Sequence, residues 1–259
     1  MTTLQKKHGA PVPASDVYAL VDFDNLLPPY EDCTREAFGL IINQLLDAIL
    51  HSIPTAERVS IRLYGGWMSN GVLSRRGSDV SAAVSGIRLF PRISIGSHRV
   101  RGDVLLATAL LAQPAVSFSD TARRRNSVPR LRLSGNPLPA GCAVTSEQCP
   151  AKILQKFTSK NSKECPVDEC MVLCRDAFVV QEQKMVDGML ICDLITLTDE
   201  QPSPSCVIVS DDTDFVPALI IGGYRSEKVF WGLRDLDLAA SHAASLPESV
   251  SLIKVAEVA

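Results

Sequence analysis

The sequence predicts an α/β fold in three layers, with a mostly parallel central sheet and helices on both of its faces. Apolar runs of strand length alternate with segments whose apolar residues recur at helical spacing, which is typical of this class. The first run, VYALVDF, is apolar without alternation, as expected for a central strand buried on both faces. Of the 259 residues, 46% are hydrophobic and 21% charged, which provides a sizeable core and excludes a disordered or collagen-like chain.

In the first hundred residues, regular structure is expected to begin after a leader at 1–15, where lysine, glycine and proline oppose it. Thr34 is a suitable helix cap because its hydroxyl can accept hydrogen bonds from the first helical amides. The expected elements are a strand at 17–23, a helix at about 34–51, a strand at 59–64, a short helix at 79–85 and a strand at about 87–95.

The middle of the chain departs from this pattern. We expect one domain over 16–259, interrupted by an insertion or subdomain at about 100–176, because arginine and cysteine collect there and the periodicity is poor. Regular patterning returns after it. The expected elements are a helix at 177–194, a strand at 206–210, a short helix at 215–224 and strands at 229–233 and 250–255.

Charge and hydropathy limit the expected partners. The formal net charge is −3, which argues against a protein that coats nucleic acid by bulk charge but allows a local basic patch. Apolar stretches such as 104–112 are shorter than the roughly 18 residues of a spanning helix, and residues 1–16 lack the apolar core of a secretory signal. We therefore expect no membrane partner and a cytoplasmic location, where eight cysteines would be buried thiols or a metal site.

Three acidic or polar clusters fall at comparable places in this pattern. They are Asp22, Asp24 and Asn25 at a strand end, Lys184 with Asp187, and Ser210 to Asp214 where a strand ends and a helix begins. Functional groups of an open parallel sheet gather outside the carboxyl ends of its strands. Clustered carboxylates repel one another unless a cation neutralises them, and oxygen ligands without His or Cys suit Mg²⁺ or Mn²⁺. The alternative for any single aspartate is a helix cap or a solvated loop.

Four segments resemble the successive motifs of NYN domains, which belong to the PIN-like nuclease superfamily. They are VYALVDFDNL, KMVDGMLICDL, CVIVSDDTDFVPAL and KVFWGL, and they cover most of 16–68 and 178–255. The third segment carries a nearly complete family motif from Ser210 to Pro217, whereas 100–176 is not accounted for. The resemblance implies a PIN-like fold and a metal-dependent ribonuclease with RNA as its substrate.

The resemblance also implies roles for individual residues. Asp22, Asp187 and Asp212 would be the primary catalytic and metal-binding carboxylates, and Asp214 would complete or support the cluster. The supporting residues would be Asp24, Asn25, Lys184 and Ser210. Hydrogen bonds from Asn25 would hold Asp22, and Lys184 would contact substrate phosphate or balance the acidic charge.

Three further acids fit the family pattern poorly. Asp193 lies six residues after Asp187, so on a helix it points away from it and is interpreted as structural. Asp211 occupies a position that is usually small in the family. Glu248 is the candidate for the family's acidic residue near the C-terminus.

An arginine cluster in the expected insertion is a candidate RNA-binding site. It consists of Arg123, Arg124, Arg125, Arg130 and Arg132. These side chains could clamp an RNA backbone with salt-dependent affinity, and no aromatic residue interleaves with them for base stacking. The alternative is a solvated, mobile loop.

The cysteines of the same segment raise the question of structural zinc. Cys142, Cys149, Cys165 and Cys170, with Cys174 as an alternative, could supply four thiolates to a tetrahedral Zn²⁺ site. None of them forms a CxxC pair, so the competing interpretation is reduced, packed thiols.

The sequence therefore favours a Mg²⁺- or Mn²⁺-dependent ribonuclease that cleaves by metal-activated water. The first alternative is a catalytically silent NYN-like module that binds RNA or a protein partner, including another copy of the chain. A less favoured alternative is a haloacid-dehalogenase-type phosphatase, because Asp22-x-Asp24 resembles the start of that family. Leu26 stands where that family has Thr or Val, and Lys184 precedes Ser210 instead of following it.

Overall fold

The computed structural model describes residues 16–27, 33–93, 99–125, 131, 149–178, 180–200 and 202–256. The chain divides into two compact units. Unit 1 comprises the residues up to Ala122 and those from Gln183 onward, and unit 2 is Arg123–Glu182. The leader expected at 1–15 lies outside the described residues.

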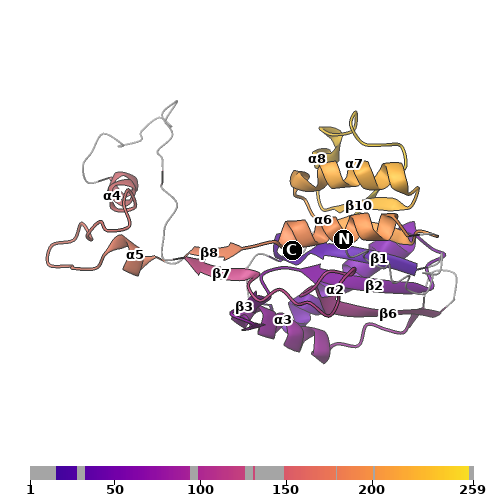
Figure 1. The fold of residues 1–259 in the computed structure, drawn as a ribbon, viewed down its shortest axis with the longest axis horizontal. Helices are drawn as coiled ribbons and strands as arrows, with labels where there is room; N and C mark the ends of the chain where they lie inside the picture. The colour runs from indigo at the N-terminus through magenta and orange to yellow at the C-terminus, as the bar shows by residue number, and fades with distance from the viewer. Residues whose placement is uncertain are drawn as a thin grey trace, which may run out of the picture. The chain divides into compact units, whose positions relative to one another are not determined.

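Unit 1 is built on a central sheet whose strand order is β11-β10-β9-β1-β2-β6-β5 (Figure 1). The strands are β1 (Asp16–Asp22), β2 (Arg58–Tyr64), β5 (Arg92–Ile93), β6 (Arg99–Leu106), β9 (Ser205–Val209), β10 (Val229–Leu233) and β11 (Val250–Lys254). Six of these strands pair in parallel, and the two-residue β5 is antiparallel to β6 at the edge. The predicted mostly parallel α/β sheet is confirmed.

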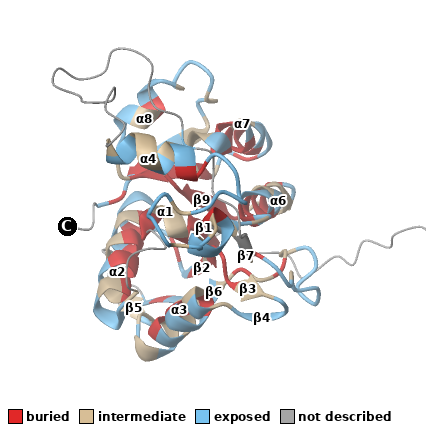
Figure 2. Ribbon diagram, turned by 90° about the vertical axis from the view of Figure 1, so that its left-hand side faces the viewer, coloured by how far each residue is buried: buried red, intermediate tan, exposed pale blue. Residues whose placement is uncertain are grey.

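Helices cover both faces of this sheet and complete three layers. The two faces carry separate apolar cores (Figure 2). On one face lie α2 (Arg35–Ser52) and α3 (Arg75–Gly86), and on the other lie α6 (Val186–Thr198) and α7 (Val216–Arg225). Alternate residues of β1 face the two cores: Ala19 belongs to the first and Leu20 to the second, and both are fully buried.

Local sequence signals explain where these helices begin. The Thr34 side chain accepts a hydrogen bond from the amide of Ala37 (3.1 Å), and Ser74 accepts one from the amide of Gly77 (3.0 Å). Each hydroxyl satisfies an amide that has no partner within the helix. Seven apolar residues of α2 from Phe38 to Leu50 recur at helical spacing and are buried, so one face of this helix packs on the sheet.

Short elements fill the connections. They are α1 (Phe23–Leu26), β3 (Met68–Ser69), β4 (Val72–Leu73), the 3₁₀ helix η1 (Thr213–Phe215) and α8 (Asp237–Ala240). Asn70 and Gly71 join β3 to β4 with positive φ angles of 51° and 78°, which this residue pair adopts more readily than others.

The connections reverse direction beside β1. From β1 the chain runs outward through β2 to β6 with α2 and α3 on one face. It returns to β9 on the other side of β1 and continues to β10 and β11 with α6 and α7 on the opposite face. The carboxyl ends of β1 and β9 therefore flank the point where an open α/β sheet commonly forms its binding crevice.

Two sequence predictions differ from the structure near the expected insertion. The strand expected at about 87–95 is wrong in extent, because 87–90 has no regular structure and β5 covers only Arg92–Ile93. The next parallel strand of the sheet is β6, which starts at Arg99. Arginine and aspartate obscure this strand in the sequence, and they are tolerated because β6 lies near the sheet edge with its side chains mostly half-exposed.

The segment after the insertion also differs. The helix expected at 177–194 is instead α5 (Cys174–Ala177), β8 (Val180–Gln183) and α6, which begins only at Val186. Met185 has a φ of 65°, a left-handed conformation that interrupts helix continuity before α6. The compact second unit accordingly runs over Arg123–Glu182, a boundary that differs at both ends from the expected 100–176.

Unit 2 contains little regular structure. Its elements are α4 (Pro150–Phe157), α5 and parts of the ribbon formed by β7 (Ala122–Arg125) and β8. The rings of Phe157 and Phe178 pack with centroids 5.7 Å apart. Across the described parts of both units, no helix is long and apolar enough to cross a bilayer.

Candidate active site

The first and third acidic clusters of the sequence converge because β1 and β9 are parallel neighbours. Val21 is the register partner of Val209, so Asp22 and Ser210 follow at the same edge of the sheet. The Ser210 hydroxyl donates to Asp22 Oδ2 (2.9 Å) and accepts from the amide of Asp212 (3.0 Å). Ser210 thus connects the end of β1 to the turn after β9.

Asp22 is the buried acid of the site, with 8% of its surface exposed. Burial raises the pKa of Asp22 to about 6, and repulsion from Asp187 and Asp24 adds to the increase. Hydrogen bonds from Ser210 and from the Asn25 amide act in the opposite direction. A carboxyl group in this state is ionised at neutral pH at a free-energy penalty that a nearby cation would relieve.

Asp187 approaches the same place from α6. Partial desolvation raises its pKa, and the charges of Asp212 and Asp214 raise it further. Since Asp187 also acts on Asp22, four aspartates from three elements interact electrostatically. Asp212 caps η1, because its Oδ1 accepts a hydrogen bond from the amide of Asp214 (2.9 Å). Asp212 is therefore both a helix cap and a member of the acidic cluster.

Asp24 is held differently because an arginine neutralises it. Arg76 of α3 places Nε and Nη2 each 3.1 Å from Asp24 Oδ1, and Oδ2 accepts from the Gly66 amide (3.3 Å) and from Gln183. Both charged side chains are largely buried. Burial raises the pKa of Asp24, and Arg76 counteracts that increase. Asp24 therefore fixes the first loop, and its arginine partner was not predicted from the sequence.

Asp211 is the second aspartate that an arginine neutralises. Arg234, the residue after β10, donates its amide to Asp211 Oδ1 (2.8 Å) and its Nε to Oδ2 (2.6 Å). The Asn25 side-chain oxygen accepts from the Asp211 amide (3.0 Å) and from Arg234 Nη2 (3.3 Å). The side chain of Asn25 thus holds the turn after β9, and only its backbone amide supports Asp22.

The remaining predicted residues of unit 1 lie as follows. Asp193 is fully buried and accepts hydrogen bonds from Tyr64 (2.6 Å) and the Leu111 amide (2.7 Å), so it is structural, as expected. Lys184 lies between β8 and α6, and its amide donates to Thr121 (3.0 Å). Glu248 precedes β11, whose first residue pairs with the first residue of β10. Glu248 is therefore at the amino ends of the strands, the edge opposite the acidic site.

Only some of the carboxylates at this site are available to bind a hard cation such as Mg²⁺. Asp24 and Asp211 are paired with arginines, which leaves Asp22, Asp187, Asp212 and Asp214 as candidate oxygen ligands. Within the described ranges, no three His, Cys, Asp or Glu side chains form a group that could hold a metal ion. An ion here would take one or two carboxylates directly and water for the rest, an arrangement that is common for Mg²⁺.

The basic and cysteine candidates lie in unit 2. Arg123, Arg124 and Arg125 belong to β7, where Arg123 is exposed. Arg130, Arg132 and Cys142 lie outside the described residues. Cys149, Cys165 and Cys170 are half-buried free thiols and Cys174 is a buried one. Among the described residues no group of three such side chains could hold a metal, so Cys149, Cys165, Cys170 and Cys174 do not by themselves form the predicted zinc site.

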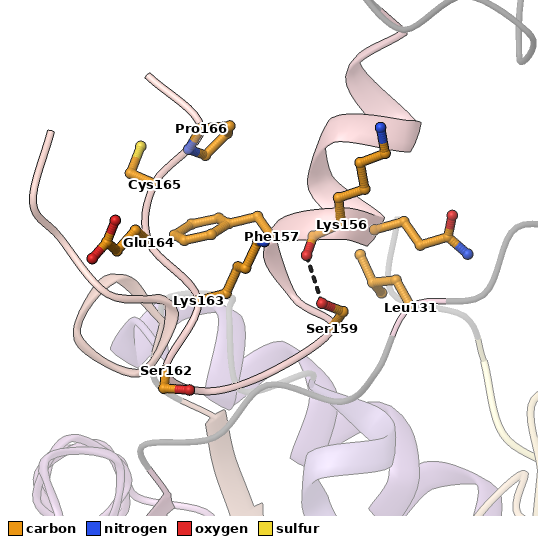
Figure 3. A pocket seen from close by; sticks show the side chains of 10 residues that line it. Leu131, Lys156, Phe157, Ser159, Ser162, Lys163, Glu164, Cys165 and Pro166 are labelled. Carbon is orange, nitrogen blue, oxygen red and sulfur yellow. Dashed lines mark hydrogen bonds between the residues drawn. The ribbon is translucent and has the colours of Figure 1, made fainter. Parts of the chain in front are cut away.

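Unit 2 also contains an open cavity of about 1010 Å³ (Figure 3). Its wall includes Lys156, Lys163, Ser159 and Ser162, together with the ring of Phe157. Glu164 also lines this cavity, and unit 2 carries basic groups in and after α4 as well as on its arginine strand.

Comparisons of this chain with protein-family models, with curated proteins and with solved structures find no match.

Proposed function

We propose that the acidic site of unit 1 hydrolyses phosphodiester bonds of RNA with the help of Mg²⁺ or Mn²⁺, within an NYN-like, PIN-like fold. The observation that carries this proposal is that Asp187 interacts with Asp22, Asp212 and Asp214 near the carboxyl ends of β1 and β9, where none of the four has an arginine partner among the described residues. The motif resemblance supports RNA as the substrate. Seven free cysteines in the described residues suit a reducing compartment, so we propose that the protein acts in the cytoplasm.

The candidate ligands are Asp22, Asp187, Asp212 and Asp214, of which an ion would take one or two directly and the others through water. A divalent cation bound there would lower the pKa of a water molecule and stabilise negative charge on a phosphate oxygen. Burial raises the pKa of Asp22 to about 6 in the absence of an ion, and a bound cation would lower this pKa and keep the carboxylate ionised. Ser210 keeps Asp22 and the Asp212 turn in register through its two hydrogen bonds.

The second candidate function is binding of RNA or a protein partner without hydrolysis. The lack of a preformed three-ligand group in the described residues favours it. The phosphatase alternative is disfavoured, because the second acid of its motif, Asp24, is engaged by Arg76, Gly66 and Gln183. A phosphorylated intermediate at Asp22 would reverse that ranking.

The test is the change Asp212→Asn, which keeps the size of the side chain and removes its charge. We expect Mn²⁺-dependent cleavage of labelled single-stranded RNA by the wild type and a loss of at least about 10³-fold in the variant. Asp176→Asn is the matched control, since Asp176 is an exposed aspartate of unit 2. Equal cleavage by wild type and Asp212→Asn contradicts the proposal, and RNA binding without cleavage by the wild type favours the binding module.

A further inference from the structure

Arg234 lies at the edge of the acidic site, and the resemblance to NYN motifs assigns it no role, because the last motif ends at Leu233. It follows Leu233, the last residue of β10, and β10 is the direct neighbour of β9. The carboxyl ends of β10, β9 and β1 therefore lie in sequence along one edge of the sheet. Arg234 occupies the first of these ends, next to the turn that carries Asp211 and Asp212.

The guanidinium group of Arg234 is held in place from one side. Its Nε bonds to Asp211 Oδ2 (2.6 Å) and its Nη2 to Asn25 Oδ1 (3.3 Å), while the Arg234 amide bonds to Asp211 Oδ1 (2.8 Å). Both carboxylate oxygens of Asp211 are thereby occupied. Among the described residues, Nη1 has no partner, and 27% of the side chain is exposed. The group is thus oriented by two contacts and still presents donors to solvent.

This arrangement suits an anion. Guanidinium groups bind phosphate oxygens through paired, charge-assisted hydrogen bonds, and orientation in advance reduces the conformational entropy lost on binding. The neighbouring acids Asp187, Asp212 and Asp214 repel a phosphate chain, so an anionic substrate needs a cation beside them.

We infer that Arg234 binds a phosphate of the RNA strand on the β10 side of the acidic site, with Asp211 and Asn25 as its positioning residues. The inference rests on the proposed function for the identity of the ligand. It also gives a reason for aspartate at position 211, because this side chain orients the arginine and is not available to an ion.

The surrounding charges limit the size of the effect. The Lys254 ammonium group donates to the Arg234 carbonyl, which brings a second cation to the end of β11. Asp235 and Asp237 follow closely in the chain and are exposed, so they oppose an approaching phosphate. One phosphate contact is therefore the expected contribution of Arg234.

The test measures RNA affinity without cleavage, using a labelled single-stranded RNA in chelator over a series of salt concentrations. For Arg234→Gln we expect affinity to fall about tenfold at low salt, the loss of one charge-assisted hydrogen bond. We also expect the slope of log K against log salt to decrease by about 0.7, as for one lost phosphate contact on a single strand. Arg225→Gln is the matched control, because Arg225 pairs with Asp199 at the end of α7.

The outcomes separate this inference from the proposed function. A salt slope that decreases in Arg234→Gln but not in Arg225→Gln supports the inference. It does so even if the wild type does not cleave RNA, a result that would reject the proposed hydrolysis and leave the phosphate contact standing. An unchanged slope in folded Arg234→Gln overturns the inference, as does a wild type that binds no RNA. If Arg234→Gln does not fold, Arg234→Lys is measured in its place. An RNA affinity of Arg234→Lys equal to that of the wild type overturns the inference. A lower RNA affinity with the salt slope of the wild type supports it.

Discussion

Unit 1 and unit 2 differ in charge, in core and in regularity. Arg123–Glu182 contains ten Lys and Arg against six Asp and Glu, a net charge of +4, whereas the rest of the chain contains 16 against 23, a net charge of −7. Unit 1 has two apolar cores on either side of its sheet, and both consist entirely of unit 1 residues. On the proposed function, the acidic unit would carry the chemistry and the basic unit would contribute affinity for RNA, a division that the following experiments test.

The largest expected effect is the difference in stability between removing a buried ion pair of unit 1 and removing an exposed ion pair of unit 2. Arg76 and Asp24 in unit 1 are 14% and 6% exposed, and Arg175 and Asp176 in unit 2 are 55% and 58% exposed. Arg76→Met leaves the Asp24 charge buried without its partner, so we expect the free energy of unfolding to fall by about 3–5 kcal/mol. Arg175→Met should change it by less than about 0.5 kcal/mol, because solvent screens that pair. Urea unfolding followed by circular dichroism measures both.

A second substitution identifies the cause of that loss. In Arg76→Met with Asp24→Asn, the unpaired buried charge is gone, so much of the lost stability should return. Equal stabilities of the single and double variants would show that Arg76 acts through packing on Phe23 and its bond to the Leu27 carbonyl instead.

The two units also differ in how much of them the sequence predicts. In unit 1, apolar runs identified β1, β9 and β10, because central strands of a parallel sheet are buried on both faces. The strands β2 and β11 were also expected, although polar residues interrupt their apolar pattern. The strand β6 was missed, since an arginine-rich strand near a sheet edge has no such run. In unit 2, the short α5 and β8 gave no periodicity long enough to detect, and a helix was expected over residues that the structure divides between three elements.

The candidate site shows a comparable limit. The aspartates of β1, α6 and the turn after β9 were found because strand ends and motifs mark them in the sequence. Arg76 and Arg234 were missed because their partners, Asp24 and Asp211, are 52 and 23 positions away. Pairing of that kind depends on which strand ends become neighbours, which no local pattern reveals. For the same reason Glu248 was a candidate for the family's C-terminal acid, although it lies at the opposite edge of the sheet.

The next effect in size is the pH dependence that Asp22 gives to unit 1 in the absence of metal. Its pKa is about 6 in the folded protein and about 3.9 in an unfolded chain. The folded state therefore binds the proton more tightly, so stability is lost as the pH rises from about 4 to about 6 and the loss is complete above that range. Asp22→Asn removes that penalty, so in chelator it should be more stable than the wild type by about 3 kcal/mol at pH 8 and about equal to it near pH 4.

Thermal melts over this pH range measure the difference, with the exposed Asp79→Asn as the control. Added Mn²⁺ should raise the melting temperature of the wild type more than that of Asp22→Asn, because only the wild type keeps the full set of carboxylates. A stability difference that is the same at pH 4 and pH 8 would contradict the role of the Asp22 charge.

The smallest effect concerns removal of unit 2. The Lys184 amide donates to the Thr121 carbonyl (3.0 Å), so the two connecting strands are adjacent where they leave unit 1. An Asn-Gly turn between Ala122 and Gln183 can therefore replace Arg123–Glu182. Because both cores lie in unit 1, we expect the shortened chain to keep its circular dichroism spectrum and cooperative melt. RNA affinity at about 0.15 M salt should fall by roughly tenfold, since the arginine strand and the lysines after α4 are lost.

A chain that keeps unit 2 but carries Ser in place of Arg123, Arg124 and Arg125 separates charge from bulk. If this variant binds RNA as weakly as the shortened chain and with the same reduced salt slope, affinity comes from the arginine strand. If it binds as the wild type does while the shortened chain does not, other groups of unit 2 contact the RNA, and the lysines beside its cavity become the next residues to substitute. Wild-type binding by both variants would remove the functional distinction between the two units and leave the contacts to the strand-end arginine of unit 1.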